Sequence, residues 1–277
     1  MTVLQQIVVF TALSGALSAA AAGVFLLLGD RWRAAVLPPL VSFATGTLLG
    51  AAFLGLIPHA LDAAGSEGTH KVGLALLLGI LVFFLLEKFV LWRHCHDDPC
   101  EVHSPGGGHR HHDGHAHGHD HGPGNDARDH ASANLILVGD TLHNLLDGVL
   151  VAAAFMTNPH LGVVTALAVF AHEIPQEVGD LAILLHGGFS RRRAMTLNLV
   201  SSLTSVVGGV VAYFALGAAL HLLPYALAFA AASFIYVAVA DLIPGLHRRV
   251  DLRASVEQFA LIAAGVALVY FTHASMH

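Results

Sequence analysis

Hydrophobic residues occur in eight long runs, which are separated by short polar joints and by one long polar stretch. A helix needs about 20 mostly apolar residues to cross the hydrocarbon core of a membrane. The pattern therefore predicts an all-α integral membrane protein with eight transmembrane helices in a lipid bilayer. The predicted helices cover residues 2–28, 35–61, 71–93, 132–157, 161–186, 194–219, 221–246 and 254–275.

The long polar stretch covers residues 94–131 and divides a single membrane domain into residues 1–93, with three helices, and residues 132–277, with five. It is rich in glycine and contains eleven histidines, a composition typical of disorder. Alternating histidines favour weak capture of metal at several points, and a cysteine beside two histidines favours a tighter site. The alternative is a solvated tether whose histidines are incidental. The candidate ligands here are Cys95, His111, His115, His117 and His119.

Composition supports the membrane assignment, because 55% of the residues are hydrophobic and only 12% are charged. Soluble domains have about 25% charged residues. The two cysteines, Cys95 and Cys100, do not indicate a disulfide framework. Residues 1–6 have no Lys or Arg and the apolar run extends to Leu28, which is too long for a cleaved signal peptide.

The distribution of Lys and Arg predicts the orientation, because short cytoplasmic loops carry an excess of these residues. Twelve of the thirteen lie in or beside the odd-numbered joints, including the long polar stretch, and only Lys71 lies on the other side. We therefore expect the long stretch in the cytosol and both termini outside. In a bacterial cell the membrane would be the plasma or inner membrane.

A short internal repeat suggests a symmetry between the two ends of the chain. Residues Leu56-Ile57-Pro58-His59 end the second predicted helix, and Leu242-Ile243-Pro244-Gly245 end the seventh. With the predicted topology, helices 1–3 and 6–8 form inverted copies around the central helices 4 and 5. Such repeats, with a binding site between them, recur in transporters. Chance recurrence in an apolar chain remains the alternative.

The two central helices contain ionisable residues, which cost roughly 2.5–3.5 kcal/mol each in a membrane and therefore indicate function. Their spacings of three and four residues place them on shared helix faces. Imidazole and carboxylate ligands suit Zn, Cd, Fe or Mn, and the absence of cysteine from the predicted helices argues against Cu(I). A purely structural polar cluster is the alternative. The main candidates are His143, Asn144, Asp147, His172, Glu173, Gln176 and Glu177, and the weaker ones are His59, Asp140, Asp180, Asn198 and Ser202.

The pair of segments His143-Asn144-Leu-Leu-Asp147-Gly and His172-Glu173-Ile-Pro-Gln176-Glu-Val-Gly-Asp resembles the ZIP metal transporters, especially their histidine-rich branch. The resemblance covers nearly the whole chain. It implies import of a divalent metal, foremost Zn2+, into the cytosol through a binuclear site. It also implies a four-helix transport unit that moves against a scaffold, and a homodimer.

The resemblance also implies roles for individual residues. The first metal position corresponds to His143, Asp147, His172, Glu173 and Gln176. The second corresponds to Asn144 and Glu173, with Gln176 shared and with Asn198 or Ser202 as looser matches. The branch usually has a second histidine where this chain has Gln176, so the metal preference is open among Zn2+, Cd2+, Fe2+ and Mn2+.

Two other functions fit parts of the pattern. Cation-diffusion efflux proteins also use a His-x-x-x-Asp pair, but they usually have six helices and cytosolic termini, which conflicts with the charge distribution. Zinc metalloproteases begin their motif with His-Glu, but they need histidine at the fifth position, where Gln176 stands. We therefore predict a transporter rather than an enzyme, with metal ions and no nucleic acid as partners.

Overall fold

The computed structural model describes residues 1–94, 123–247 and 251–274, and within these ranges every element is a helix. The prediction of an all-α chain is confirmed for this part. Its main helices are α1 (Val3–Leu27), α2 (Asp30–Gly50), α3 (Ile57–His94), α4 (Pro123–Thr157), α5 (Pro159–His186), α6 (Arg191–Ser202), α7 (Thr204–Ala218), α8 (Leu223–Tyr236), α9 (Ile243–Leu246) and α10 (Leu252–Ala274).

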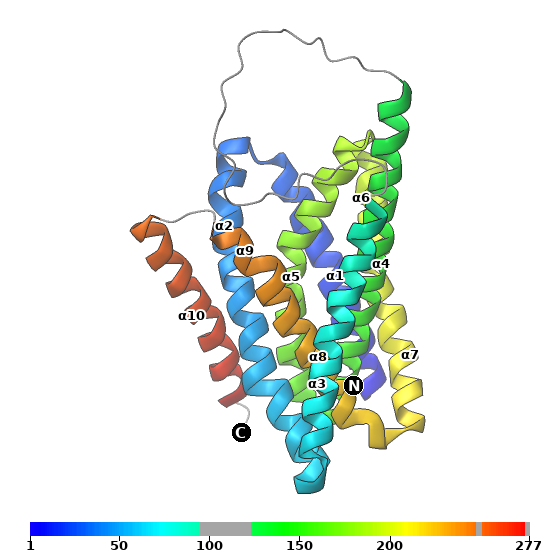
Figure 1. Cartoon of the computed structure of the whole chain (residues 1–277), viewed down its shortest axis with the longest axis vertical. Helices are drawn as coiled ribbons and strands as arrows, with labels where there is room; N and C mark the ends of the chain where they lie inside the picture. The colour runs from blue at the N-terminus through cyan, green and yellow to red at the C-terminus, as the bar shows by residue number, and fades with distance from the viewer. Residues whose placement is uncertain (95–122, 248–250, 275–277) are drawn as a thin grey trace.

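Six helical stretches of the described chain are long and apolar enough to cross a membrane. One of them, Arg31–Lys88, covers the second predicted segment and most of the third, because the chain reverses at Gly65 within α3 (Figure 1). Gly65 has a φ of 66°, a left-handed conformation that favours glycine. Helix α5 is not among the six, since its polar residues from His172 to Asp180 lower the hydropathy of its second half.

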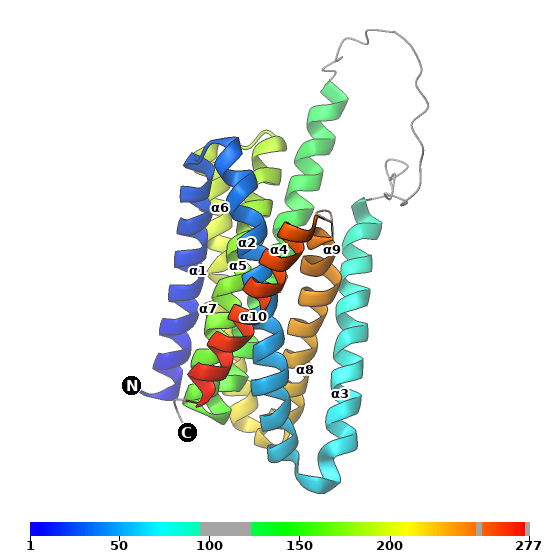
Figure 2. The same ribbon diagram turned by 90° about the vertical axis from the view of Figure 1, so that its left-hand side faces the viewer.

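The long helices run side by side as a bundle (Figures 1 and 2). Both termini lie at one end, while the end of α3 and the start of α4 lie at the other. The termini therefore share one side of the bundle, and the flanks of the long polar stretch share the other side.

Part of the predicted polar stretch is helical. Helix α4 begins at Pro123, so residues 123–131, which we assigned to the polar stretch, are helical. Proline suits the first turn of a helix, and two of the nine residues that follow are the good helix former alanine. The candidate ligands Cys95, His111, His115, His117 and His119 lie outside the described residues.

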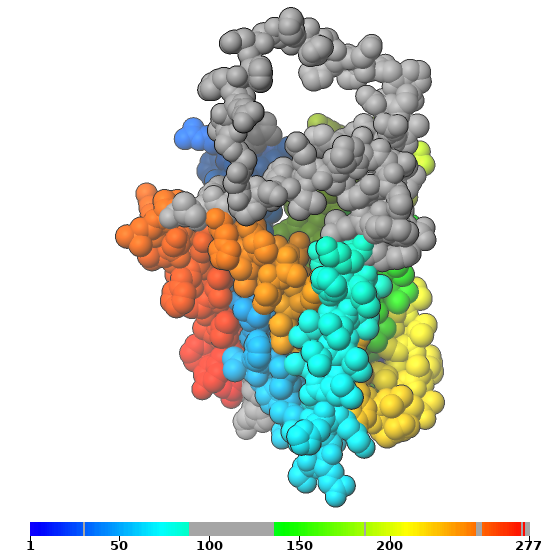
Figure 3. All heavy atoms as spheres, viewed as in Figure 1, coloured from blue at the N-terminus to red at the C-terminus, as the bar shows by residue number. Residues whose placement is uncertain are grey.

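The face formed by α3, α8 and α10 is visible in Figure 3. Helix α3 exposes an apolar side chain on nearly every turn of this face. Such a surface is expected of a helix that faces lipid, because a helix that is apolar all round is buried in protein or in a membrane. The exposed leucines of α3 include Leu74, Leu77, Leu78, Leu81 and Leu85.

Glycines determine how closely the helices approach. A Cβ atom added to Gly148 of α4 would lie 1.8 Å from the carbonyl oxygen of Ser205 in α7, and one added to Gly208 of α7 would lie 1.9 Å from that of Leu145. In the same way, Gly46 of α2 lies against the backbone of α10, and Gly265 of α10 lies against the backbone of α2. Small residues let membrane helices pack backbone to backbone, and the α4–α7 contact brings α6 alongside α4 and α5.

Two short π-helices, η1 (Ala51–Leu56) and η3 (Val237–Leu242), precede Pro58 and Pro244. At the end of each, an isoleucine N–H donates to a carbonyl five residues back, that of Ala52 or Ala238. A proline disrupts the regular helical ladder, and a π-turn is one way to absorb that disruption. The two Leu-Ile-Pro motifs thus share the same backbone distortion.

Candidate metal centre

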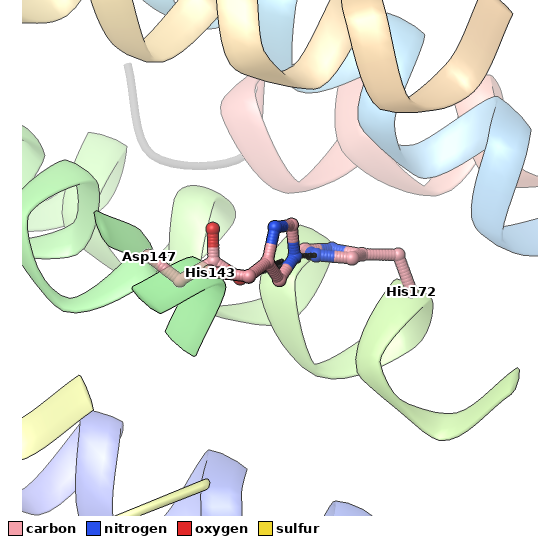
Figure 4. Close-up of side chains that lie close together, drawn as sticks. All are labelled: His143, Asp147 and His172. Atoms are coloured by element: carbon pink, nitrogen blue, oxygen red, sulfur yellow. Dashed lines mark hydrogen bonds and ion pairs between the residues drawn. The ribbon is translucent and has the colours of Figure 1, made fainter. Parts of the chain in front are cut away.

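Three side chains from two adjacent helices meet at one point (Figure 4). His143 and Asp147 lie one turn apart on α4, and His172 faces them from α5. The Nε2 atom of His172 is 3.1 Å from Asp147 Oδ2, and that of His143 is 3.5 Å from the same oxygen. The two Nε2 atoms are 3.3 Å apart. We call these three residues the His–Asp–His trio.

The trio lies halfway along the bundle. His172 is the fourteenth of the 28 residues of α5, and the α4 members lie within the apolar stretch Ile136–Thr157. Asp147 and His172 are each 1% exposed, whereas the side chain of His143 is 19% exposed. The trio is therefore buried in protein and accessible through His143.

The ring of His172 is oriented by its own helix. Its Nδ1 atom is 3.0 Å from the carbonyl oxygen of Ala168, which only accepts hydrogen bonds. Nδ1 therefore carries a proton, and in the neutral ring the lone pair is on Nε2, which faces Asp147. This arrangement is typical of metal-binding histidines, whose second nitrogen donates to a carbonyl. Phe234 of α8 packs against the same ring, with the centroids 6.0 Å apart.

A second group of polar side chains, from α4, α5 and α6, supplies further oxygen atoms. Asn144 donates to Asp140 Oδ1 at 2.8 Å, and Ser201 of α6 also donates to Asp140. Ser202 of α6 donates to Glu177 Oε1 at 2.5 Å. Buried polar atoms usually have hydrogen-bond partners, yet several here have none in the described residues. These unpaired oxygens are Asn144 Oδ1, Glu173 Oε1, Glu177 Oε2, Asp180 Oδ2 and Asn198 Oδ1.

The remaining candidates lie at the edge of this arrangement. Gln176 is partly buried one turn after His172, and within the described chain no hydrogen bond joins its side chain to the trio. His59 directs Nδ1 to the carbonyl oxygen of Gly55, 2.8 Å away, and lies outside the trio. Asp180 interacts electrostatically with Asp140, which extends the carboxylate group along α5.

Sequence reasoning missed two buried serines, Ser14 and Ser18 of α1, which both donate to Glu173. The four-residue spacing of the α1 serines in an otherwise apolar helix was the available signal. A serine in a membrane helix, however, is also common in ordinary packing, so residue type and spacing alone do not select it.

Comparison with known proteins identifies relatives along nearly the whole chain. The family model "ZIP Zinc transporter" matches residues 6–273. Mouse zinc transporter ZIP4 is 35% identical in an alignment of 265 positions that covers 79% of this chain and 39% of the mouse protein. Human zinc transporter ZIP13 is 32% identical in an alignment of 302 positions, gaps included, that covers 93% of this chain and 79% of the human protein. Mouse zinc transporter SLC39A7 is 31% identical in an alignment of 297 positions that covers 84% of this chain and 62% of the mouse protein. The chain thus spans about two fifths of the length of the ZIP4 relative.

Proposed function

Because the chain belongs to the family of ZIP zinc transporters, we propose that it transports a divalent metal, foremost Zn2+, across a membrane into the cytosol. The proteins it resembles are named as zinc transporters, and the chain has six stretches suited to crossing a membrane. The site is a transport site for metal as substrate and does not catalyse a chemical reaction. Cd2+, Fe2+ and Mn2+ are further candidate substrates.

The spacing of the His–Asp–His trio is the observation that carries this proposal. Ligand atoms at about 2.0–2.2 Å from a tetrahedral zinc ion lie about 3.3–3.6 Å from one another. The three ligand atoms of the trio are 3.1, 3.3 and 3.5 Å apart. The protein alone therefore holds two nitrogens and one oxygen near the separations that a zinc ion requires. A site with three protein ligands also leaves a coordination position open for exchange.

We propose a second metal position beside the trio, which makes the site binuclear. Buried oxygens without hydrogen-bond partners are expected ligands of a cation, and such atoms belong to Asn144, Glu173, Glu177 and Asn198. Glu173 follows His172 directly and interacts electrostatically with it and with Asp147, so its carboxylate is suited to lie between two ions. With two neighbouring positions, an ion could bind first at one and then at the other as it moves along the transport path.

The membrane topology that we propose has eight crossings, with the termini outside and the long polar stretch in the cytosol. The reversal at Gly65 divides the stretch Arg31–Lys88 into two crossings, and α5, which lies within the bundle, adds another to the six stretches. The matched π-helices η1 and η3 support an inverted repeat, in which the first three predicted crossings correspond to the last three.

The packing supports a division into a moving unit and a scaffold. Helices α1, α4, α5, α6 and α7 pack on one another around the trio, whereas α2, α3, α8 and α10 form the other group. The homodimer that the resemblance implies stays a prediction, and the mass of the detergent-solubilised protein would test it.

Substitution of the trio tests the function directly. His172→Ala and Asp147→Ala should each reduce 65Zn2+ uptake into cells or vesicles by at least about 100-fold at low metal, while the protein still reaches the membrane. Structural zinc sites with four ligands contribute about 10–16 kcal/mol, so one ligand corresponds to roughly 2.5–4 kcal/mol. His160→Ala, which removes an exposed histidine from the first turn of α5, is the matched control. Uptake at the wild-type level in either trio variant would contradict the proposal.

The direction of transport needs a separate test. Epitope tags on the N- and C-termini should be accessible to antibody from outside intact cells. A tag that is reached only after permeabilisation would contradict the orientation and favour efflux.

A further inference from the structure

Two serines of the first helix reach the centre of the bundle. Ser14 and Ser18 lie one turn apart on α1 and are 7% and 0% exposed. Their hydroxyl groups lie 3.2 and 2.9 Å from the same atom, Oε2 of Glu173 on α5. Ser18 and Glu173 are 155 residues apart in sequence, so this contact exists only in the folded protein.

This contact gives the two carboxyl oxygens of Glu173 different hydrogen-bonding environments. Oε2 accepts from both hydroxyls, whereas Oε1 is buried and has no hydrogen-bond partner in the described residues. The hydroxyl of Ser18 also lies 3.1 Å from the carbonyl oxygen of Gly15, and its single proton favours the closer acceptor, Glu173 Oε2 at 2.9 Å. A carboxylate held on one side by two donors has a restricted rotamer and presents the other oxygen as the free ligand.

The backbone of α1 is placed to make this contact. Gly15 lies between the two serines in sequence, and a Cβ atom added there would lie 2.8 Å from the carbonyl oxygen of Ser202 on α6. The absence of a side chain at Gly15 thus lets α1 approach α6 closely, on the side where Ser202 donates to Glu177. The first helix therefore contacts α5 and α6, two of the helices that supply oxygens to the site.

We propose that Ser14 and Ser18 are positioning residues, which hold Glu173 through Oε2 so that Oε1 is directed to the metal. This inference rests on the proposed function and adds to it a determinant of metal affinity that is remote in sequence and touches no ion. Hydrogen-bond partners of metal ligands typically contribute 10- to 100-fold to affinity or activity when removed. The serines orient Glu173 before the ion arrives, so the ion does not have to organise its own ligand.

The test compares the double variant Ser14→Ala/Ser18→Ala with the wild-type protein. Zn2+ binding to the purified full-length chain in detergent is measured by calorimetry, and uptake is measured over a range of Zn2+ concentrations. We expect binding to weaken by about 10- to 100-fold, with a corresponding rise in the Zn2+ concentration for half-maximal uptake. Thr11→Val is the control, because Thr11 is a buried hydroxyl of the same helix that donates only to carbonyls of α1. It should leave binding unchanged.

A double-mutant cycle separates positioning from a general effect on the fold. In a Glu173→Ala background the two serine substitutions should have no further effect on Zn2+ affinity, since the group that they orient is gone. Ser14→Thr, which keeps the hydroxyl, should retain affinity that Ser14→Ala loses. The same loss in both backgrounds, or no loss in the double variant, would overturn the proposal.

The outcomes also distinguish this proposal from the function on which it rests. If His172→Ala abolishes uptake while the serine variants behave like the wild type, only the role of the serines is wrong. If His172→Ala leaves uptake intact, the transport site lies elsewhere and both proposals fall.

Discussion

Replacement of Gly148 by alanine tests how the helix packing supports the site, although Gly148 itself offers no ligand. It lies one residue after Asp147 on α4, against the backbone of α7. An alanine Cβ would lie 1.8 Å from the carbonyl oxygen of Ser205, 2.6 Å from its carbonyl carbon and 2.8 Å from the backbone nitrogen of Gly209. All three atoms belong to the backbone, so no side chain can rotate away to make room.

The magnitude follows from the shift that the helices must make. An ordinary contact begins at 3.4 Å, so α4 and α7 have to separate by about 1.6 Å, and overpacking of this kind costs about 1–3 kcal/mol. The same shift opens the 3.0 Å bond from Thr204 Oγ1 to the carbonyl of Thr141 and the bond from Ser201 to Asp140, at about 1 kcal/mol each. Alanine returns about 1 kcal/mol of helix propensity. The net destabilisation is about 2–4 kcal/mol.

The assay is thermal unfolding of the purified protein in detergent, combined with Zn2+ uptake. A change of 1 kcal/mol shifts Tm by about 2–4 °C in chains of 150–250 residues, so Gly148→Ala should lower Tm by roughly 4–16 °C. Uptake should fall as well, because α6, which directly precedes α7 in the chain, carries the hydroxyl of Ser201 that bonds Asp140. Gly217→Ala is the matched control on α7, where an added Cβ meets nothing within 4 Å. It should leave Tm unchanged or raise it slightly.

The comparison of Tm and Zn2+ uptake between Gly148→Ala and Gly217→Ala tests whether α4 and α7 are in backbone contact. If Gly148→Ala is as stable and as active as Gly217→Ala, α4 and α7 are not in backbone contact at this point. The conclusion that close packing of α4 and α7 positions α6 beside the site would then be wrong.

Two further predictions concern residues that the trio does not include. Deletion of residues 103–122, which stops short of α4, should leave metal uptake present but alter its response to cytosolic metal. Complete loss of uptake from correctly inserted protein would place this stretch in the transport path. Gln176→His should strengthen Zn2+ and Cd2+ in competition with Mn2+ and Fe2+ for uptake at low concentration, because imidazole is a softer and stronger ligand than the amide oxygen. An unchanged order of the four metals would show that Gln176 is not a ligand.

Local patterns in the sequence were enough for the helical class and for the faces of the central helices. Hydropathy over windows of about 20 residues identifies the membrane stretches because the bilayer imposes that length. The spacing of His143 and Asp147 places them on one face because a helix repeats every 3.6 residues. Both signals are local, so they do not depend on how the helices pack, and the trio's residue types could be chosen without a structure.

Tertiary structure alone decided which faces meet and which atoms remain for a metal. The 3.1 Å approach of His172 to Asp147 depends on the relative rotation and height of α4 and α5, which follow from packing between helices. The role of Ser18 shows most clearly what the sequence alone cannot determine. A hydroxyl in an apolar helix bonds equally well to its own backbone, as Thr11 does, or to a distant partner such as Glu173. Only the position of α1 against α5 selects between them, because a hydrogen bond requires its two atoms to lie within about 3 Å, and no pattern within one helix contains that distance.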